Sequence, residues 1–392
     1  MPIKEESFRR GCGRYIEGAG YIEKIGEEVK RVGTSPLIVG GETALSITRE
    51  KIEKSVTGIC EKYEFKEHKG TCNEDDAEIF ADLAAKNGYD VIVGVGGGVI
   101  CDFAKLVGYF AHLPVINIPT SSATCAAYTP LSVRYTREGK TVGTRHYEFE
   151  VAAVIADTEI IAKQPVRLLL SGVFDALAKF VEIKQRFNGE TKEYPMGLNY
   201  AYAISEYSYN FLNDKTQKCI DDMEKGEITF EVENMIFTTI AATGVISGIA
   251  RGSNQTALAH KFYTVTRTLF PESAKPYLHG EIVGVGLLLQ NYFNGEEENN
   301  KELLCLMKKY NMPCKVEDIG ADKSKETFEK YYDGILHSSA IDNPGEREEK
   351  LLREALRYLW ERCKNAETKL IVSAFFYFVM VISLVSPFQE TL

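Results

Sequence analysis

The chain has 392 residues, of which 44% are hydrophobic and 26% charged, a composition typical of a globular protein with a sizeable core. A formal net charge of −10 and dispersed basic residues argue against nucleic-acid binding. The nine cysteines form no CxxC pair, and the first twenty residues contain no apolar run. We therefore expect reduced thiols, no secretory signal and a cytoplasmic protein.

Residues 1–160 alternate short apolar runs with amphipathic stretches, a pattern that predicts β-strands alternating with helices. The runs expected to be buried strands lie at 35–41, 90–98, 114–124 and 151–157. Because these strands are apolar on both faces, they indicate a parallel sheet covered by helices on both sides. Residues 131–147 alternate around a central turn, which predicts a β-hairpin. The first domain is therefore expected to be a Rossmann-like α/β nucleotide-binding domain.

Residues 161–365 show mostly helical periodicity and are expected to form an all-helical second domain. A ligand site is expected at the junction of the two domains. The tail, residues 366–392, contains an uncharged run at 370–386 that is at the lower limit of length for a bilayer helix. A buried or oligomer-covering segment is favoured over a membrane anchor, and we expect a homo-oligomer.

A glycine cluster, Gly96, Gly97 and Gly98, ends one predicted strand and precedes a helix. Backbone N–H groups and the helix dipole at such a turn favour a phosphate group, and glycine permits its close approach. The spacing matches neither GxGxxG nor a Walker loop, so a tight structural turn is the alternative. Thr120, Ser121 and Thr124 end the next strand; their hydroxyls could donate to the same ligand or belong to a cap or loop network.

Three metal-compatible side chains, Asp175, His260 and His279, stand far apart in the sequence. One carboxylate and two imidazoles can hold a divalent ion and leave positions open for a substrate. Their separations of 85 and 19 residues carry no local metal signature. Asp175 is expected in the first turns of a helix capped by Ser171. Taken alone, a residue like Asp175 is more often a capping group than a ligand, and histidines like His260 and His279 are more often core residues.

Six segments occur in one order within residues 10–365, and they read GGGxxxDxAK, PTxxxT, TPLSVRYT, SGxxDALAK, AH and LHGExVxxG. In this order they resemble the iron-containing alcohol dehydrogenase and glycerol dehydrogenase superfamily. The resemblance implies a dehydroquinate synthase-like fold with a nucleotide-binding domain and a helical catalytic domain. It also implies Zn²⁺ or Fe²⁺ in the cleft, held by Asp175, His260 and His279.

The chain departs from its relatives at residues that bear on the substrate. Cys125, in TCAAYTPLSVRYT, stands where glycerol dehydrogenases have an aspartate. The wording of this stretch is more similar to the hydroxycarboxylate dehydrogenase B-like branch, which implies small 2-oxo acids as substrates. An anionic substrate needs a cationic partner, and Arg134, Arg145 and Arg251 are the candidates.

Two further departures concern the metal and the cofactor. Lys179 stands where iron-dependent relatives place a fourth ligand, a histidine, so three protein ligands and zinc are expected. Gly40 and Gly41 stand at the strand end where NAD-preferring relatives often have an acid that binds the ribose hydroxyl. The sequence therefore leaves both NAD and NADP open.

The leading hypothesis is hydride transfer between a nicotinamide cofactor and a small alcohol or 2-hydroxy acid, with the metal as Lewis acid on the substrate oxygen. Asp102 and Lys105 are expected to orient the cofactor, with a surface ion pair as the alternative. Tyr263, one helical turn after His260, is a candidate for proton relay. Alternative hypotheses are a dehydroquinate synthase-like cyclase, although the SxGGK stretch expected of it is absent, and an inactive nucleotide-binding homologue.

Overall fold

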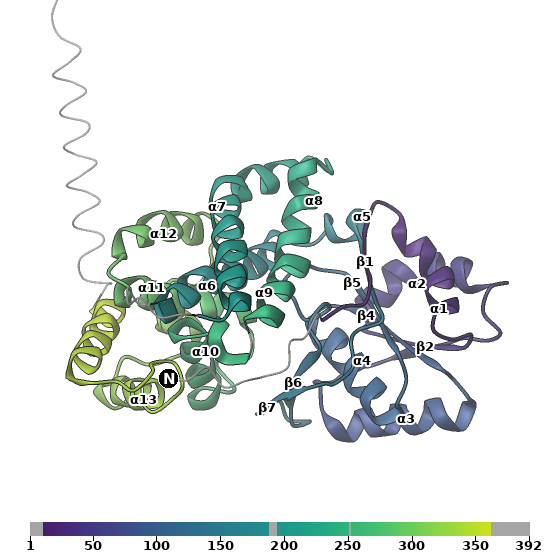
Figure 1. Cartoon of the computed structure of the whole chain (residues 1–392), viewed down its shortest axis with the longest axis horizontal. Coiled ribbons are helices and arrows are strands. Elements are labelled where there is room, and N and C mark those ends of the chain that lie inside the picture. The colour runs from purple at the N-terminus through teal and green to yellow at the C-terminus, as the bar shows by residue number, and fades with distance from the viewer. Residues whose placement is uncertain (1–10, 188–193, 251, 362–392) are drawn as a thin grey trace, which may run out of the picture.

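A computed structural model describes residues 11–187, 194–250 and 252–361. A strand-containing N-terminal part lies beside a group of helices formed by the rest of the chain (Figure 1). The predicted α/β and all-helical architecture is thereby confirmed. The tail 366–392, with its apolar run, lies outside the described residues. The domain boundaries, the cytoplasmic location and the homo-oligomer stay predictions.

The sheet has six strands, paired in parallel throughout, in the spatial order β1-β8-β5-β4-β2-β3. The strands are β1 (Tyr15–Gly18), β2 (Pro36–Gly40), β3 (Glu64–Glu67), β4 (Val91–Gly96), β5 (Val115–Pro119) and β8 (Ala153–Asp157). Four of them, β2, β4, β5 and β8, are buried along their whole length, as the apolar runs predict. Parallel pairing brings the carboxyl ends of β4 and β5 to the same edge of the sheet.

Helices cover both faces of the sheet, and the side chains of β2 alternate between them. Ile38 packs with one layer, whereas Leu37 and Val39 pack with the other. The first layer comprises η1 (Tyr21–Lys24), α1 (Ile25–Lys30) and α2 (Glu42–Val56); the second comprises α3 (Glu74–Asn87) and α4 (Gly98–Ala111). A strand that is buried on both faces is thus explained by its two helical layers.

The predicted hairpin is present as an antiparallel pair of strands, β6 (Leu131–Tyr135) and β7 (Thr141–His146). Its first strand is tied to α4, because Asp102 accepts a hydrogen bond from the Val133 N–H at 2.9 Å. In Figure 1 the hairpin lies near the side of the sheet part that faces the helical part. Side chains of the hairpin thereby reach the region where the two parts meet.

The helical part begins after α5 (Thr158–Ile161). Its longer helices are α6 (Val166–Phe187), α7 (Met196–Glu224), α8 (Phe230–Phe237), α9 (Thr243–Ile249), α10 (Leu258–Leu269), α11 (His279–Phe293), α12 (Asn300–Lys309) and α13 (Lys325–Leu336). Shorter turns are η2 (Thr238–Ala242), η3 (Gly252–Gln255), η4 (Glu297–Asn299) and η5 (Glu317–Ile319), and residues 346–361 are also helical. Helices α6, α10 and α11 contribute to one large core cluster.

Within the part of the chain that the structure describes, one continuous helix, Phe230–Ile249, is long and apolar enough to be a candidate membrane span. It comprises α8, η2 and α9, and 56% of its most apolar window is buried inside the protein. A mostly buried apolar helix is typical of a globular core, so length and composition alone are weak grounds for a membrane span.

Helix α6 starts earlier than predicted. It begins at Val166, directly after Pro165, a residue that suits the start of a helix. Ser171 is therefore inside the helix, and the prediction that it caps the helix is wrong. Its hydroxyl instead accepts a hydrogen bond from the Gly280 N–H at 3.1 Å. Asp175 projects from the middle of a rigid helix, whose residues from Leu169 to Ile183 are all buried.

Candidate active site

The structure brings together the three residues that the sequence separates. Asp175 lies in the middle of α6, His260 near the start of α10, and His279 is the first residue of α11. One potential ligand atom from each lies within 4.8 Å of the others. The Asp175 Oδ1 atom is 3.1 Å from His260 Nε2 and 3.5 Å from His279 Nε2. The two imidazoles and the carboxylate therefore face one common point.

Glu182 holds His260 from behind. Its Oε2 atom lies 2.6 Å from His260 Nδ1, and its Oε1 atom accepts the backbone N–H groups of Ala257 and His260 at 2.8 Å each. Because a carboxylate here favours a proton on Nδ1, Nε2 is the ring nitrogen that faces Asp175 and that can bind an ion once it has released its own proton. Burial lowers the pKa of His260, but the charge of Glu182 and the hydrogen bonds with Asp175 and Glu182 together outweigh it and raise the pKa overall.

The charge of Asp175 is stabilised in spite of its burial. Burial raises the pKa of this carboxyl, but the Lys179 ammonium and hydrogen bonds from His260 and His279 outweigh it and hold the pKa well below its usual range. Burial lowers the pKa of His279 and favours its neutral form. An ionised carboxylate and imidazole lone pairs are the donors that a divalent transition metal requires, so these residues fit such an ion.

Lys179 projects into the same place, one helical turn after Asp175. Its Nζ atom lies 3.4 Å from His260 Nε2 and 3.8 Å from Asp175 Oδ1. The side chain is 5% exposed. The resemblance predicts that residue 179 is not a metal ligand. The structure places a buried ammonium group there, close to two of the candidate metal ligands, His260 and Asp175.

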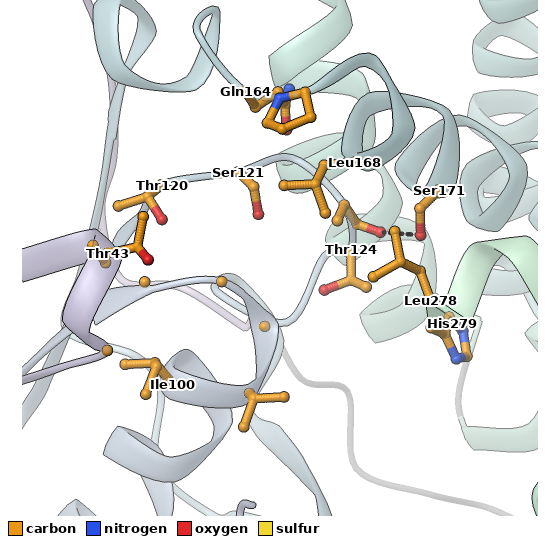
Figure 2. A pocket seen from close by; sticks show the side chains of 18 of the residues that line it. Thr43, Ile100, Thr120, Ser121, Thr124, Gln164, Leu168, Ser171, Leu278 and His279 are labelled. Atoms are coloured by element: carbon orange, nitrogen blue, oxygen red, sulfur yellow. Dashed lines mark hydrogen bonds between the residues drawn. The ribbon is translucent and has the colours of Figure 1, made fainter. Parts of the chain in front are cut away.

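A cavity of about 1200 Å³, here called the larger cavity, opens over the glycine turn between β4 and α4. It is lined by Gly96, Gly97, Gly98, Thr120, Ser121, Thr124 and, farther away, His279. Figure 2 shows Thr43 and Thr120 at one end of this cavity, His279 at the other, and Ser121 between them. The hydroxyl and glycine candidates thus share one wall, as the parallel pairing of β4 and β5 predicts.

A second cavity of about 740 Å³, here called the smaller cavity, adjoins the larger one. The two share Gly98, Val99, Thr124, Tyr135, Tyr263 and His279. The smaller cavity is also lined by Asp102, Cys125, Asp175, Lys179 and His260. Because the cavities adjoin at these residues, a ligand in the larger cavity can contact a second ligand that is bound at the three-residue cluster in the smaller one.

Two predicted residues line the smaller cavity near the cluster. The thiol of Cys125 has its pKa raised to about 11, mainly by burial and also by the charge of Asp175, so it is a neutral thiol. The ring of Tyr263 packs edge-on against His279 with centroids 4.3 Å apart. The Tyr263 hydroxyl lies 3.5 Å from that of Tyr135.

The environment of Lys105 corrects its predicted role as a cofactor contact. The side chain is fully buried, and its ammonium donates to the backbone carbonyls of Ala126, Thr129 and Leu131. It also pairs with Asp102 Oδ1 at 2.8 Å. Lys105 lines neither cavity and instead braces the loop before β6. Asp102 does face the smaller cavity, as part of a buried pair and not of the surface pair considered as the alternative.

Gly40 and Arg134 also lie away from both cavities. A Cβ atom at Gly40 would lie 2.9 Å from the carbonyl oxygen of Val95, so this glycine permits close packing of β2 against β4. Its neighbour Gly41 lines the larger cavity. Arg134 is paired with Glu74, which corrects its prediction as a substrate contact.

A second arginine candidate, Arg145, also lies away from the cavities. It is 2.6 Å from the same carboxylate, Glu74, and lines neither cavity. The third candidate, Arg251, lies outside the described residues and stays a prediction.

The sequence did not lead us to predict the contact of Glu182 with His260 or the position of the Lys179 ammonium beside the cluster. A signal was present, since Asp175, Lys179 and Glu182 follow each other at intervals of four and three residues in an otherwise apolar stretch. On a helix this spacing places three charged groups on one face. A buried charged face of this kind is itself a mark of a functional site.

Comparison with known proteins agrees with this architecture. Residues 12–158 match the family profile described as iron-containing alcohol dehydrogenase. The chain is 32% identical over 280 residues to a glycerol dehydrogenase of Escherichia coli, covering 71% of this chain and 75% of the relative. The chain belongs to the iron-containing alcohol dehydrogenase superfamily.

A second member of this superfamily, hydroxycarboxylate dehydrogenase A of Escherichia coli, is 32% identical over 262 residues, which cover 65% of this chain and 69% of the relative. A crystal structure of a probable glycerol dehydrogenase from Sinorhizobium meliloti superposes with a TM-score of 0.77 at 23% identity, covering 91% of this chain and 99% of that one. The superfamily fold is thereby shown, and the protein is an alcohol dehydrogenase-type oxidoreductase.

Proposed function

We propose that this protein is a metal-dependent, nicotinamide-linked dehydrogenase that interconverts a small alcohol or 2-hydroxy acid and the corresponding carbonyl compound. The observation that carries the proposal is the position of the Asp175, His260 and His279 cluster in the smaller cavity, with His279 lining the larger cavity as well. Hydride transfer requires that the cofactor and the substrate meet directly, and two adjoining cavities provide for this.

In this proposal Asp175, His260 and His279 hold the divalent ion, and zinc is favoured because Lys179 replaces a fourth ligand. When bound, the ion supplies Lewis-acid polarisation of the substrate oxygen. Glu182 fixes the tautomer and the ring orientation of His260 through the 2.6 Å contact with Nδ1. The Tyr263 hydroxyl, which lines both cavities, relays the proton between substrate oxygen and solvent.

The larger cavity takes the nicotinamide cofactor. Gly96, Gly97 and Gly98 bring backbone N–H groups at the start of α4 to the diphosphate, and the hydroxyl groups of Thr120, Ser121 and Thr124 lie along the same wall. The cavity extends past Gly41 to Glu42, where the adenosine ribose of NAD or NADP would lie. The cavity wall thus offers backbone N–H and hydroxyl groups for the diphosphate and a carboxylate, Glu42, near the proposed ribose position.

The nature of the relatives and of the smaller cavity supports a small substrate. The two relatives named above act on glycerol and on hydroxycarboxylates, according to their names. In this chain the cavity presents the neutral thiol of Cys125 where glycerol dehydrogenases have a carboxylate. A thiol offers a polyol no strong hydrogen-bond acceptor, so we place a 2-hydroxy acid ahead of glycerol.

The test combines metal analysis with cofactor oxidation. Purified protein is loaded with zinc, and oxidation of NADH and NADPH is followed with 2-oxo acids, aldehydes and dihydroxyacetone. The His260→Ala and His279→Ala variants are expected to lose stoichiometric zinc and at least 100-fold in activity, because each removes one of three ligands. His337→Ala, at an exposed histidine directly after α13, is the matched control. Full zinc content in both ligand variants would refute the assignment.

A further inference from the structure

We propose that the ammonium of Lys179 binds the substrate carboxylate, which makes a small 2-oxo or 2-hydroxy acid the substrate class of this site. The inference rests on the proposed function and deepens it. It assigns a cationic partner, a role for which Arg134 and Arg145 are placed in neither cavity. The supporting observations are the isolation of Lys179 among the cavity residues, its burial, and its distance from the ligand cluster.

Lys179 is the one lysine or arginine among the described residues that line the smaller cavity. Arg134 and Arg145 are both held by Glu74 outside it, and Lys105 is enclosed by backbone carbonyls. An anionic ligand in this cavity therefore meets one fixed positive charge from the described side chains. That charge is carried by the same rigid helix as Asp175.

The ammonium is almost fully removed from water, with a side chain that is 5% exposed. A buried charge is tolerated where a counter-charge or hydrogen-bond acceptors compensate for the lost hydration. The acceptors near Nζ are Asp175 Oδ1 and His260 Nε2, and both are also proposed ligand atoms. Once His260 Nε2 coordinates an ion, it has no lone pair left for an N–H donor, and the charge of Asp175 is shared.

Among the described residues that line the smaller cavity, no further carboxylate is free to replace Asp175 and His260 as acceptors for Lys179. The acidic residues in it are Asp175 itself and Asp102, which pairs with Lys105 at 2.8 Å. In the loaded site Lys179 would therefore share Asp175, its one carboxylate partner in the described lining, with the ion until a ligand brings a second. A substrate carboxylate fills this role through a charge-assisted hydrogen bond.

The geometry of a 2-oxo acid fits the short spacing. Its carboxylate is bonded directly to the carbonyl carbon, so the two kinds of oxygen are near neighbours. The Nζ atom of Lys179 is 3.4 Å and 3.8 Å from the two ligand atoms, so the ammonium and the ion site are near neighbours, as the two kinds of oxygen in a 2-oxo acid require. A neutral polyol such as glycerol brings no charge for Lys179.

The carboxylate is unchanged in the reaction. The hydride of NADH or NADPH adds to the carbonyl carbon, and the C=O π pair moves to the oxygen, which takes one proton. The products are the 2-hydroxy acid and the oxidised cofactor. The reverse reaction returns the hydride to the cofactor and the proton to the solvent.

The test compares pyruvate with hydroxyacetone, which differ in a carboxylate against a neutral CH₂OH group on the same ketone. The ratio of kcat/KM for pyruvate to that for hydroxyacetone is measured with zinc-loaded protein and the preferred reduced cofactor. In Lys179→Met the ratio is expected to fall about 10- to 100-fold, the range for loss of one charge-assisted hydrogen bond. Lys179→Arg is expected to restore part of the ratio.

The matched control is Lys184→Met, which removes a lysine from the same helix that pairs with Glu296 and lines neither cavity. Its ratio is expected to equal that of the wild type. Lys179→Gln tests the same ratio with a polar neutral group in case methionine disturbs folding. An equal loss of kcat/KM for pyruvate and hydroxyacetone in Lys179→Met and Lys179→Gln would overturn the inference. A wild-type protein that prefers hydroxyacetone or a phosphorylated ketone to pyruvate would also overturn it.

Binding of oxamate, a non-reacting isostere of pyruvate, gives a readout that needs no turnover. Calorimetry on zinc-loaded protein with NADH is expected to show at least tenfold weaker oxamate binding in Lys179→Met, at equal zinc content. Zinc-loaded wild-type protein that oxidises neither NADH nor NADPH with any carbonyl compound would refute the proposed function itself. If the zinc-loaded protein is active but neither the pyruvate-to-hydroxyacetone ratio of kcat/KM nor the oxamate affinity changes on substitution of Lys179, this inference alone is refuted.

Discussion

Gly280 lies directly against the backbone of Ser171. The Gly280 N–H donates to Ser171 Oγ at 3.1 Å, and a Cβ atom at Gly280 would lie 1.8 Å from the Ser171 carbonyl oxygen. This contact sets the distance between α6, which carries Asp175, and the first turn of α11, which begins at His279. A residue without a side chain is thus required for two ligand candidates to meet.

The Gly280→Ala substitution is therefore expected to push α11 away from α6. We expect the free energy of unfolding to fall by about 1–3 kcal/mol, as in other over-packed cores, together with weaker zinc binding. Urea denaturation and zinc competition with a chelator measure the two effects. Gly345→Ala is the control, because a Cβ atom there meets a flexible Glu348 side chain at 3.4 Å. Unchanged zinc affinity in Gly280→Ala would contradict the proposed role of this contact.

Glu182→Gln is expected to weaken zinc binding about 10- to 100-fold. The glutamine carbonyl can still accept the backbone N–H groups of Ala257 and His260, but its NH₂ group then faces His260 Nδ1. That arrangement moves the imidazole proton to Nε2, where it blocks coordination. Zinc competition measures the loss, and Glu296→Gln, which removes the charge of the Lys184 partner, is the control. Equal affinities for zinc in the two variants would argue against a positioning role of Glu182.

Gly97→Ala separates cofactor binding from folding. Its backbone has φ −75°, which alanine adopts readily, and a Cβ atom there would meet only Ser121 Oγ, at 3.5 Å, among described atoms. The methyl group would nevertheless occupy the wall along which the diphosphate is proposed to lie. We expect about a tenfold higher KM for the reduced cofactor at an unchanged melting temperature. A KM equal to that of the wild type would place the cofactor elsewhere.

Cys125 is expected to resist alkylation although it lines a cavity. Because burial and the Asp175 charge raise its pKa to about 11, about 0.1% of it is thiolate at pH 8. The reaction with iodoacetamide should accelerate as the pH rises towards 11. Mass spectrometry of the alkylated peptides is expected to find the exposed Cys305 modified first. Preferential labelling of Cys125 at neutral pH would contradict a protonated thiol.

Glu17 predicts a pH dependence of stability outside the site. Burial raises its pKa to about 7, while the unfolded chain releases the proton near 4.5. The folded state holds more protons between these values, so the free energy of unfolding falls as the pH rises from about 4.5 to 7 and stays lower above.

Replacement of this carboxyl by a neutral amide should remove the dependence. Glu17→Gln keeps an acceptor for the Tyr15 hydroxyl and is expected to melt about 2 °C higher than the wild type at pH 8 but not at pH 4.5. Scanning calorimetry at the two pH values measures the difference. Glu23→Gln, at an exposed position, is the control. The same shift at both pH values would point to packing instead of charge.

Most of the sheet was predictable because its strands are apolar and separated by helical periodicity. The runs at β2, β4, β5 and β8, and the hairpin of β6 and β7, all form as predicted. The start of α6 was missed because Ser171 resembles a capping residue, whereas Pro165 sets the real start. Local signals compete at helix ends, and tertiary contacts such as the one with Gly280 decide between them.

The site was predictable only through the order of its motifs. Spacing alone left Asp175, His260 and His279 unconnected, because their meeting depends on how three helices pack. Lys105 and Arg134 were misassigned for a related reason. Charged residues next to a glycine turn or in a hairpin look available in the sequence, whereas here buried carbonyls and Glu74 engage them.

Helix α6 carries Asp175, Lys179 and Glu182 on one face, and its backbone is held by close contacts on either side. Residue 179 can thus be exchanged while the proposed metal ligands keep their places. Asp175, proposed for the chemistry, and Lys179, proposed for substrate choice, thus lie one helical turn apart on the same helix. New substrates can then be reached during evolution by a single codon change, with the hydride chemistry left intact.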